Sequence, residues 1–226
     1  MKYQVLEPSV ELIESMRAVG YSMEAAVADI VDNSLDAEAG NVWIDVDVVS
    51  GNHLAILDDG KGMDEQTAFE ALRFAGTAGR SEQQRLGRFG LGLKTASLSQ
   101  ARCLTVMTKQ KNHIHVLRWS IDHVKEVGSW DIMIPELHEV EIFPFRDEFL
   151  ALETGTLVVW SDLDLLLGDA EDPGMFLSER VANLGQHLSL TFHRYLENKS
   201  KASRIYVNGL NIPPLDPFLR SNVKTQ

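Results

Sequence analysis

The sequence predicts an α+β fold in which a mostly antiparallel sheet packs against helices. Two helical patterns precede any strand pattern along the chain. Residues 42–58 then alternate as two strands around a short Ser-Gly-Asn turn, which is typical of a β-hairpin. Three further strand patterns within residues 103–134 follow one another as expected for an antiparallel meander.

The two helices are predicted from capping and periodicity. Pro8 and Ser9 precede an apolar-periodic segment at residues 10–16. The second helix is expected over residues 22–37, and it carries two opposed stripes. The apolar stripe, which we expect to face the core, consists of Met23, Val27, Ile30, Val31 and Leu35.

The opposite stripe of this second helix is acidic. Its members recur at i, i+3, i+4 and i+7, and they are Asp29, Asp32, Asn33 and Asp36. Like charges at these spacings repel one another, and no lysine or arginine lies among them. A divalent cation, or a water molecule that must lose a proton, would explain this choice of residues.

The predicted hairpin joins residues 42–48 to residues 53–58 and ends in Asp58, which Gly60 and Gly62 follow. Asp-Gly is a common turn pair, so the motif could be only the exit of the hairpin. However, a carboxylate at the end of an apolar strand needs hydrogen-bond donors, and the exocyclic amine of adenine is a suitable donor. The glycines would then let a purine approach the backbone.

A predicted helix at residues 64–74 leads into a small-residue segment at residues 75–81. Gly87, Gly90 and Gly92 then open the next predicted helix. Backbone amides of such a loop can bind an anion near a helix start, although glycine-rich loops also occur for steric reasons alone. The pattern is not a Walker loop, and no parallel βαβ unit surrounds it as a dinucleotide fold requires.

The remaining pattern is mainly that of strands. They are predicted at residues 103–108, 114–120, 130–134 and 156–160. Residues 143–152 match no clear pattern, residues 176–196 predict a long helix, and residues 204–208 predict a last strand. We expect residues 1–218 to form one domain and residues 219–226 to be a frayed tail.

Composition limits the class of protein. The contents of 44% hydrophobic and 24% charged residues are ordinary for a globular protein. The net charge of -12 would repel a nucleic-acid backbone, so contact with DNA would require other regions. The single cysteine, Cys103, fits a reducing cytoplasm, and no apolar run approaches the roughly 18 residues that cross a bilayer. We therefore expect a cytoplasmic protein without membrane contact.

Together the motifs resemble those of the GHKL ATPases, the superfamily of DNA gyrase B, the ninety-kilodalton heat-shock chaperones, histidine kinases and MutL. The resemblance covers roughly residues 10–165 and depends on the acidic stripe, the Asp58 motif, the glycine loop and Gly155-Thr156 in that order. Residues 32–37 and 90–97 are most similar to the MORC-like branch and its bacterial relatives. The resemblance implies a two-layer α/β sandwich, the Bergerat-type fold, with the nucleotide between helices and sheet.

The resemblance also implies roles for individual residues. Asn33 would bind the Mg²⁺ that bridges the phosphates of ATP, and Asp58 would recognise the adenine amino group. Gly62 and Met63 would lie along the base, and Thr156 would join the water network around the carboxylate. The other residues expected to bind the nucleotide are Asp36, Gly60, Thr77, Gly87, Arg88, Gly90, Gly92, Leu93 and Lys94. The glycines at the loop and Lys94 would close on the phosphates as part of a lid.

The chain departs from the superfamily at the general base. Members that hydrolyse ATP place a glutamate four residues before the Mg²⁺-binding asparagine, whereas this chain has Asp29. The missing methylene would set the carboxylate roughly 1.5 Å farther back, and a misplacement of about 1 Å can cost on the order of 100-fold in rate. We expect Asp29 to be the base, with Asp32, which points about 60° around the helix, as its substitute.

Three candidates have competing interpretations. Lys94 could be a helix-surface lysine instead of a phosphate contact. Among the arginines of the predicted lid, Arg88 is the best candidate to steer phosphates, although lid loops are often basic only for solubility. His113 and His115 share a strand face as a metal pair would, but no neighbouring cysteine or carboxylate completes a ligand set in the sequence.

The expected function is Mg²⁺-dependent binding and slow hydrolysis of ATP. Binding would close the lid and promote a homodimer within a larger MORC- or MutL-like machine, which a downstream effector domain or subunit would complete. A nucleotide-binding switch without useful hydrolysis is an alternative, because of Asp29. A protein kinase of the histidine or anti-sigma type is another, although no phosphoacceptor-histidine dimerisation helices precede the domain.

Overall fold

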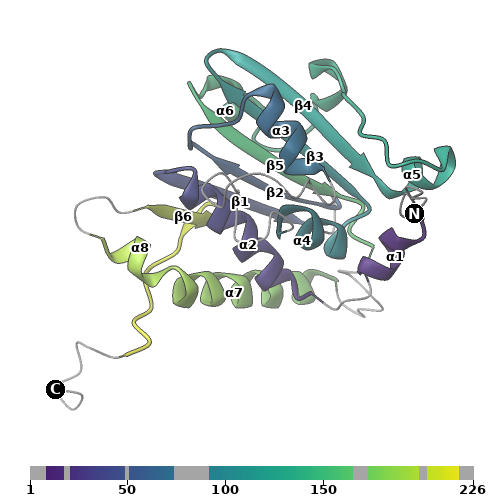
Figure 1. Cartoon of the computed structure of the whole chain (residues 1–226). Coiled ribbons are helices and arrows are strands. Elements are labelled where there is room, and N and C mark those ends of the chain that lie inside the picture. The colour runs from purple at the N-terminus through teal and green to yellow at the C-terminus, as the bar shows by residue number, and fades with distance from the viewer. Residues whose placement is uncertain are drawn as a thin grey trace, which may run out of the picture.

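The computed structural model describes residues 9–17, 21–48, 51–73, 92–164, 173–198 and 203–218. In these residues a twisted sheet forms one layer, and α2, α4 and α7 cover one of its faces (Figure 1). The arrangement confirms the expected α+β sandwich with a mostly antiparallel sheet. No helix in the described ranges combines the length and the apolar content of a membrane span.

The sheet contains seven strands within the described residues, in the order β4-β3-β5-β2-β1-β6-β7. Their bounds are β1 Asn41–Asp47, β2 His53–Asp58, β3 Cys103–Gln110, β4 His113–Ser120, β5 Gly155–Ser161, β6 Arg204–Val207 and β7 Leu210–Asn211. Every neighbouring pair is antiparallel except β1 and β6, which run parallel. The central β5 and β2 are therefore paired on both sides along their length.

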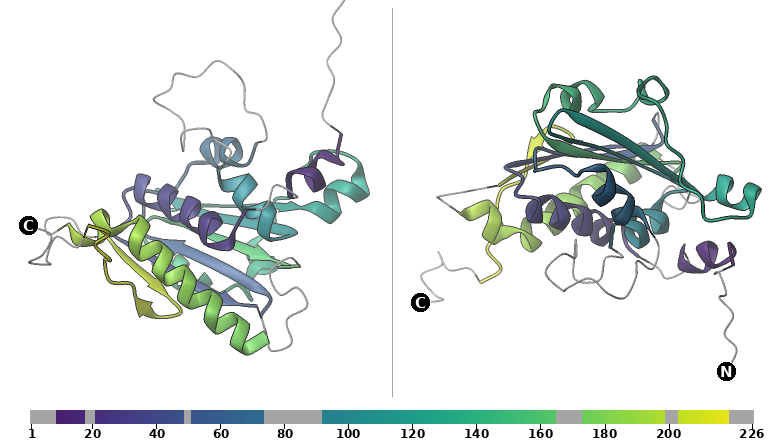
Figure 2. Two further views of the ribbon diagram at one scale, coloured as in Figure 1. Left: turned by 90° about the horizontal axis from the view of Figure 1, so that it is seen from below. Right: turned by 45° about the horizontal axis from the view of Figure 1, so that its top comes forward.

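The helices connect and cover these strands. Their bounds are α1 Leu12–Arg17, α2 Met23–Asp36, α3 Glu65–Leu72, α4 Gly92–Gln100, α5 Ile121–Val127, α6 Arg146–Ala151, α7 Pro173–Thr191 and α8 His193–Glu197. The helices α2 and α7 run side by side across the sheet, and α6 lies on its other face (Figure 2). The nucleotide site expected between helices and sheet would thus lie on the α2 side.

The pattern of α2 explains its orientation. Ser22 caps the helix, since its Oγ accepts a hydrogen bond of 3.2 Å from the amide of Ala25. The whole predicted apolar stripe is buried in the main core, together with the inward residues of β1, namely Val42, Ile44 and Val46. The acidic stripe consequently faces away from the core, as predicted.

The strand predicted at residues 130–134 is wrong. Ser120 ends β4 and caps α5, because its Oγ accepts from the amide of His123, and Gly128 closes that helix with a φ of 69°. After this detour the chain returns to the sheet only at one isolated bridge, between Met133 and Arg118. The chain therefore forms α5 after the Ser120 cap, and the alternating residues 130–134 do not form a strand of the sheet.

Three further differences concern segments late in the chain. The unassigned residues 143–152 contain α6, whose Phe149 is buried against the second face of the sheet. The predicted long helix is divided at Phe192, which separates α7 from α8. A short hairpin, not predicted, joins β6 to β7 through Asn208 and Gly209, both at positive φ, which is the typical chemistry of a type I′ turn.

Candidate functional site

The predicted site residues that the structure describes come from elements on the helical side of the sheet. The helix α2 lies over the end of β2, and α4 packs against α2 (Figure 1). A Cβ placed on Gly92, the first residue of α4, would lie 3.6 Å from Oδ2 of Asp29. Asp58 is reached from the same helix through Ser34. The structure thus joins the acidic stripe, the Asp58 motif and the start of α4 into one region.

Asp58 is a buried carboxylate, with only 4% of its surface exposed. Its Oδ2 accepts a hydrogen bond of 2.9 Å from the hydroxyl of Ser34, and its Oδ1 accepts one of 2.9 Å from the amide of Gly60. Burial nevertheless raises the pKa of Asp58 to about 6, because the hydrogen bonds from Gly60, Ser34 and the backbone of Thr156 do not fully replace the water that the carboxylate loses. The group is therefore held in place while retaining capacity to accept another hydrogen bond.

A layer of hydroxyl groups lies beside Asp58. Thr156 is opposite Asp58 in the β2–β5 register, and its Oγ1 is 3.3 Å from Oγ1 of Thr108 on β3. The Thr108 hydroxyl also accepts a hydrogen bond of 2.8 Å from the amide of Met63. These contacts connect the loop after β2 to the adjacent strands, and the register places Thr156 opposite Asp58.

The two glycines after Asp58 are required by close packing. A Cβ on Gly60 would lie 2.9 Å from the backbone oxygen of Ala37, and a Cβ on Gly62 would lie 2.0 Å from that of Lys109. Gly62 also has a φ of 62°, which favours glycine. Gln110 Nε2 donates to the carbonyl of Gly62 at 3.3 Å, so this loop is fixed against β3. The loop is thus already closely packed on its sheet side.

The polar stripe of α2 is accessible to solvent along the second half of the helix. Asp29 and Asn33 are half-buried one turn apart, whereas Asp32 and Asp36 are exposed. Partial burial, followed by the negative charges of Asp36 and Asp29, raises the pKa of Asp32. Asn33 therefore lies between carboxylates on a face that is accessible from outside, where an oxygen ligand for a hard cation could act.

Tyr21 is a residue of this region that the sequence did not predict. Its hydroxyl donates a hydrogen bond of 2.5 Å to Oδ2 of Asp29. That hydrogen bond, with burial and the negative charge of the carboxylate, raises the pKa of Tyr21 to about 12. Helical periodicity could not reveal the contact, because Tyr21 lies before the Ser22 cap and outside α2.

Lys94 is buried, with 1% of its surface exposed. Its Nζ donates a hydrogen bond to the backbone oxygen of Arg73, the residue that follows α3. Burial lowers the pKa of Lys94 to about 8, and the charge of Glu70 opposes this shift. The interpretation of Lys94 as a helix-surface lysine is therefore wrong, and its ammonium group faces the C-terminal end of α3.

The remaining predicted residues fall into two groups. Met63 and Leu93 are half-buried and pack against the main core. Four others lie outside the described residues, and they are Thr77, Gly87, Gly90 and Arg88. The glycine loop is thus represented in the structure by its last member, Gly92.

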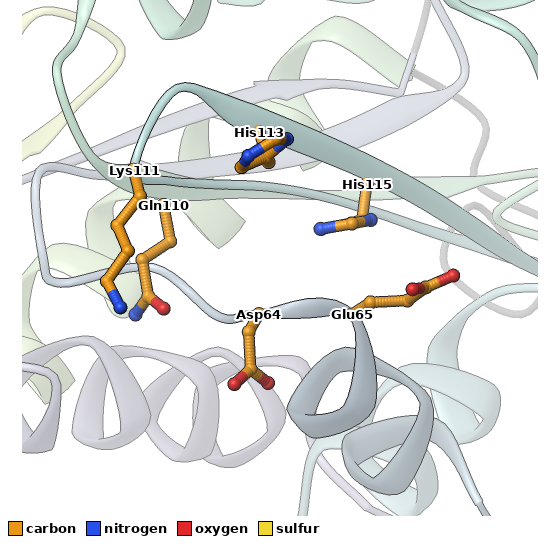
Figure 3. A pocket seen from close by; sticks show the side chains of 6 residues that line it. All are labelled: Asp64, Glu65, Gln110, Lys111, His113 and His115. Carbon is orange, nitrogen blue, oxygen red and sulfur yellow. The ribbon is translucent and has the colours of Figure 1, made fainter.

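A separate cavity of about 310 Å³ lies between the β3–β4 turn and the start of α3. Figure 3 shows His113 and His115 on the strand and Asp64 and Glu65 across from them, with the Asp64 carboxylate directed away from the imidazoles. The fold thus brings carboxylates to the histidine pair that sequence spacing did not reveal. No group of three or more metal-binding side chains is formed within the described residues.

Comparison with known proteins gives a family match. The model of the histidine kinase-, DNA gyrase B- and HSP90-like ATPases matches residues 21–156. Human ATPase MORC2 is 32% identical over 115 residues, which are 49% of this chain and 11% of MORC2. ATPase morc-1 of Caenorhabditis elegans is 36% identical over 94 residues, 41% of this chain and 11% of that protein.

A plant protein matches a shorter stretch. The structural maintenance of chromosomes flexible hinge domain-containing protein GMI1 of Arabidopsis thaliana is 41% identical over 64 residues, 26% of this chain and 4% of the plant protein. The chain therefore spans about a tenth or less of the length of these relatives. The matched family region, in contrast, extends from Tyr21 to Thr156 and contains every described residue of the candidate site.

Proposed function

Because this chain belongs to the histidine kinase-, DNA gyrase B- and HSP90-like (GHKL) ATPases, on their MORC-like branch, we propose that it binds ATP with Mg²⁺ beside α2 and hydrolyses it slowly. The observation that carries this proposal is the buried Asp58 carboxylate at the end of β2, which Ser34 joins to α2. In this proposal, the site has two ends: Asp58 marks the end that binds the adenine base, and the polar stripe of α2 marks the end that binds the phosphates.

At the base-binding end, Asp58 accepts a hydrogen bond from the exocyclic amine of adenine. Ser34 donates to Oδ2 and Gly60 donates to Oδ1, and a carboxylate can accept about four hydrogen bonds in all, so Asp58 can accept a further one from a ligand. An additional donor stabilises the buried negative charge of Asp58. Part of the binding free energy therefore comes from reducing the desolvation penalty of this carboxylate. Thr156 and Thr108 extend this polar surface beside the carboxylate.

At the phosphate end, Asn33 would hold Mg²⁺ through its side-chain oxygen. A half-buried amide beside Asp32 and Asp36 suits a hard cation that takes most of its ligands from phosphates and water. The ion, when bound, supplies charge neutralisation across the phosphates. The acidic stripe thereby receives the positive charge that its sequence lacks.

Asp29 acts as general base in this proposal. It would accept the proton of the water that attacks the γ-phosphate, while Asn33, one turn further along α2, would hold the metal. The side chain is one methylene shorter than glutamate, so turnover is slow. A nucleotide-binding switch without useful hydrolysis is the alternative that this same short side chain favours.

The wider machine belongs to the same proposal. ATP promotes closure of a lid that includes the glycine loop and Lys94, and it promotes pairing of two copies of the chain. Because the matched stretches are small parts of the relatives, a further domain or subunit supplies the effector and any contact with DNA. Residues 1–218 form a single domain in this view.

Isothermal titration with a non-hydrolysable ATP analogue tests the binding proposal. We expect binding that requires Mg²⁺ and that weakens when Asn33→Ala removes the ligand oxygen. Absence of binding to the folded wild-type protein would refute it. Light scattering with and without the analogue tests dimerisation, and phosphate release by the wild-type protein separates the ATPase from the switch.

A further inference from the structure

The Asp29 carboxylate is asymmetric in its surroundings. Its Oδ2 accepts the hydrogen bond of 2.5 Å from Tyr21, and the start of α4 at Gly92 lies beside the same oxygen. Among the described residues, no hydrogen bond reaches Oδ1. One oxygen is thus engaged by the protein, and the other is available to a water molecule.

Tyr21 is itself anchored independently of its hydroxyl. Gln100, which is buried at the end of α4, donates a hydrogen bond of 2.8 Å from Nε2 to the backbone oxygen of Tyr21. The following residue, Ser22, caps α2. The path of the chain into α2 is therefore fixed by a carbonyl and a cap, and the phenol is not needed to hold it.

We propose that Tyr21 is a positioning residue for ATP hydrolysis, which holds Oδ2 of Asp29 so that Oδ1 faces the attacking water. The inference rests on the proposed function of Asp29 as base. A short carboxylate on an open helix face rotates freely about two torsions, and a fixed phenol selects one of its orientations. Tyr21 stays protonated throughout, since the negative charge of Asp29 opposes formation of a phenolate.

This arrangement also links the base to the glycine loop. The helix α4 holds Tyr21 at its last residue and lies beside Asp29 at its first residue, Gly92. Both ends of α4 therefore contribute to the position of the carboxylate. A fixed orientation of the carboxylate thus compensates in part for the shorter reach of Asp29 compared with glutamate.

The test compares Tyr21→Phe, which removes only the hydroxyl, with the wild-type protein. We expect kcat for phosphate release to fall on the order of 10-fold, while KM and the affinity for an ATP analogue change less than about twofold. Tyr195→Phe is the matched control, because Tyr195 is exposed on α8 and its side chain belongs to none of the elements that form the candidate site. It is expected to leave kcat unchanged.

A second comparison separates positioning from a structural role. In an Asp29→Asn background, Tyr21→Phe should cause no further loss, because both changes act through one group. A loss of the same size in both backgrounds would overturn the proposal. A separate measurement uses NMR of ¹³C-labelled tyrosine, in which Asp29→Asn should return the pKa of Tyr21 from about 12 toward its ordinary value of 10.0.

The outcomes also distinguish this inference from the function on which it rests. Phosphate release that depends on Asp29 but is unaffected by Tyr21→Phe would overturn only the role of Tyr21. Release at the background rate in both the wild-type protein and Asp29→Asn would overturn the ATPase and the positioning role together. Unchanged analogue binding in that case would leave ATP binding intact.

Discussion

Asp58 and Asp29 are two carboxylates of the candidate site that differ in burial and in the number of their hydrogen-bond donors. Each accepts a hydrogen bond from a hydroxyl, that of Ser34 or that of Tyr21. Asp58 has a second donor in the amide of Gly60 and is buried, whereas Asp29 is half-buried at the edge of the helix layer. Under the proposed function, the sheet already positions the carboxylate that would bind the base, whereas the phosphate end would be completed by the metal ion and phosphates of the ligand.

The largest effect is expected from Asp29→Asn, which breaks the phosphate end alone. Loss of the general base should lower kcat for phosphate release on the order of 1000-fold. Affinity for the ATP analogue should change little, because Asp58 and Asn33 remain. Asp32→Asn, on the same stripe, is the control and should retain most of the activity. A similar loss in both variants would instead make the stripe as a whole responsible.

Asp58→Asn breaks the base-binding end alone. The amide presents a donor toward the adenine amine, so we expect affinity to fall on the order of 100-fold. The free energy of unfolding should rise by about 1–2 kcal/mol, because a buried charge is removed while the Gly60 contact is retained. Titration calorimetry and thermal unfolding measure the two effects. A variant that is both weaker in binding and less stable would contradict this division.

The same carboxylate predicts a pH dependence. Its pKa lies at about 6, above the ordinary 3.8, so protonation removes an acceptor and ATP affinity should fall as pH decreases through 6. The folded state binds this proton more tightly than the unfolded chain does. The free energy of unfolding should therefore fall as the pH rises from 3.8 to about 6. The corresponding cost is about 3 kcal/mol at neutral pH. Asp58→Asn should abolish both trends, as titrations at several pH values will show.

The smallest effect is expected at Lys94. Comparing an ATP analogue, ADP and adenosine shows whether this residue contributes to binding the phosphates or the base. Lys94→Met removes a buried ammonium group, so the free energy of unfolding should change by less than about 1 kcal/mol. If Lys94 moves to the phosphates on binding, affinity for the ATP analogue should fall several-fold, with a smaller loss for ADP and none for adenosine. Equal losses for all three ligands would restrict Lys94 to its contact with Arg73.

The parts of the molecule that the sequence predicts well are those set by local patterns. The buried stripe of α2 follows from periodicity, and the burial of Asp58 follows from its place at the end of an apolar strand. In these places the neighbours along the chain are also the neighbours in space. Local propensity and the tertiary fold therefore favour the same structure.

Other features could not be predicted because the partners are far apart in sequence or outside a periodic element. Lys94 is directed to Arg73 by the packing of α4 near α3, which no spacing within α4 reveals. Tyr21 meets Asp29 from outside the helix. The α5 detour after β4, in contrast, had a signal in the capping serine at residue 120 that was outweighed by alternation.

The parallel pairing of β6 with β1 bears on how the protein is made. The side chain of Asn208 accepts a hydrogen bond of 2.8 Å from the amide of Val46, a partner 162 positions earlier. During translation the outer edge of β1 stays unpaired until β6 has left the ribosome, since domains gain their long-range contacts only as synthesis proceeds. Such an edge can pair with other chains. Nascent chains stalled before β6 should therefore be a preferred substrate of ribosome-associated chaperones.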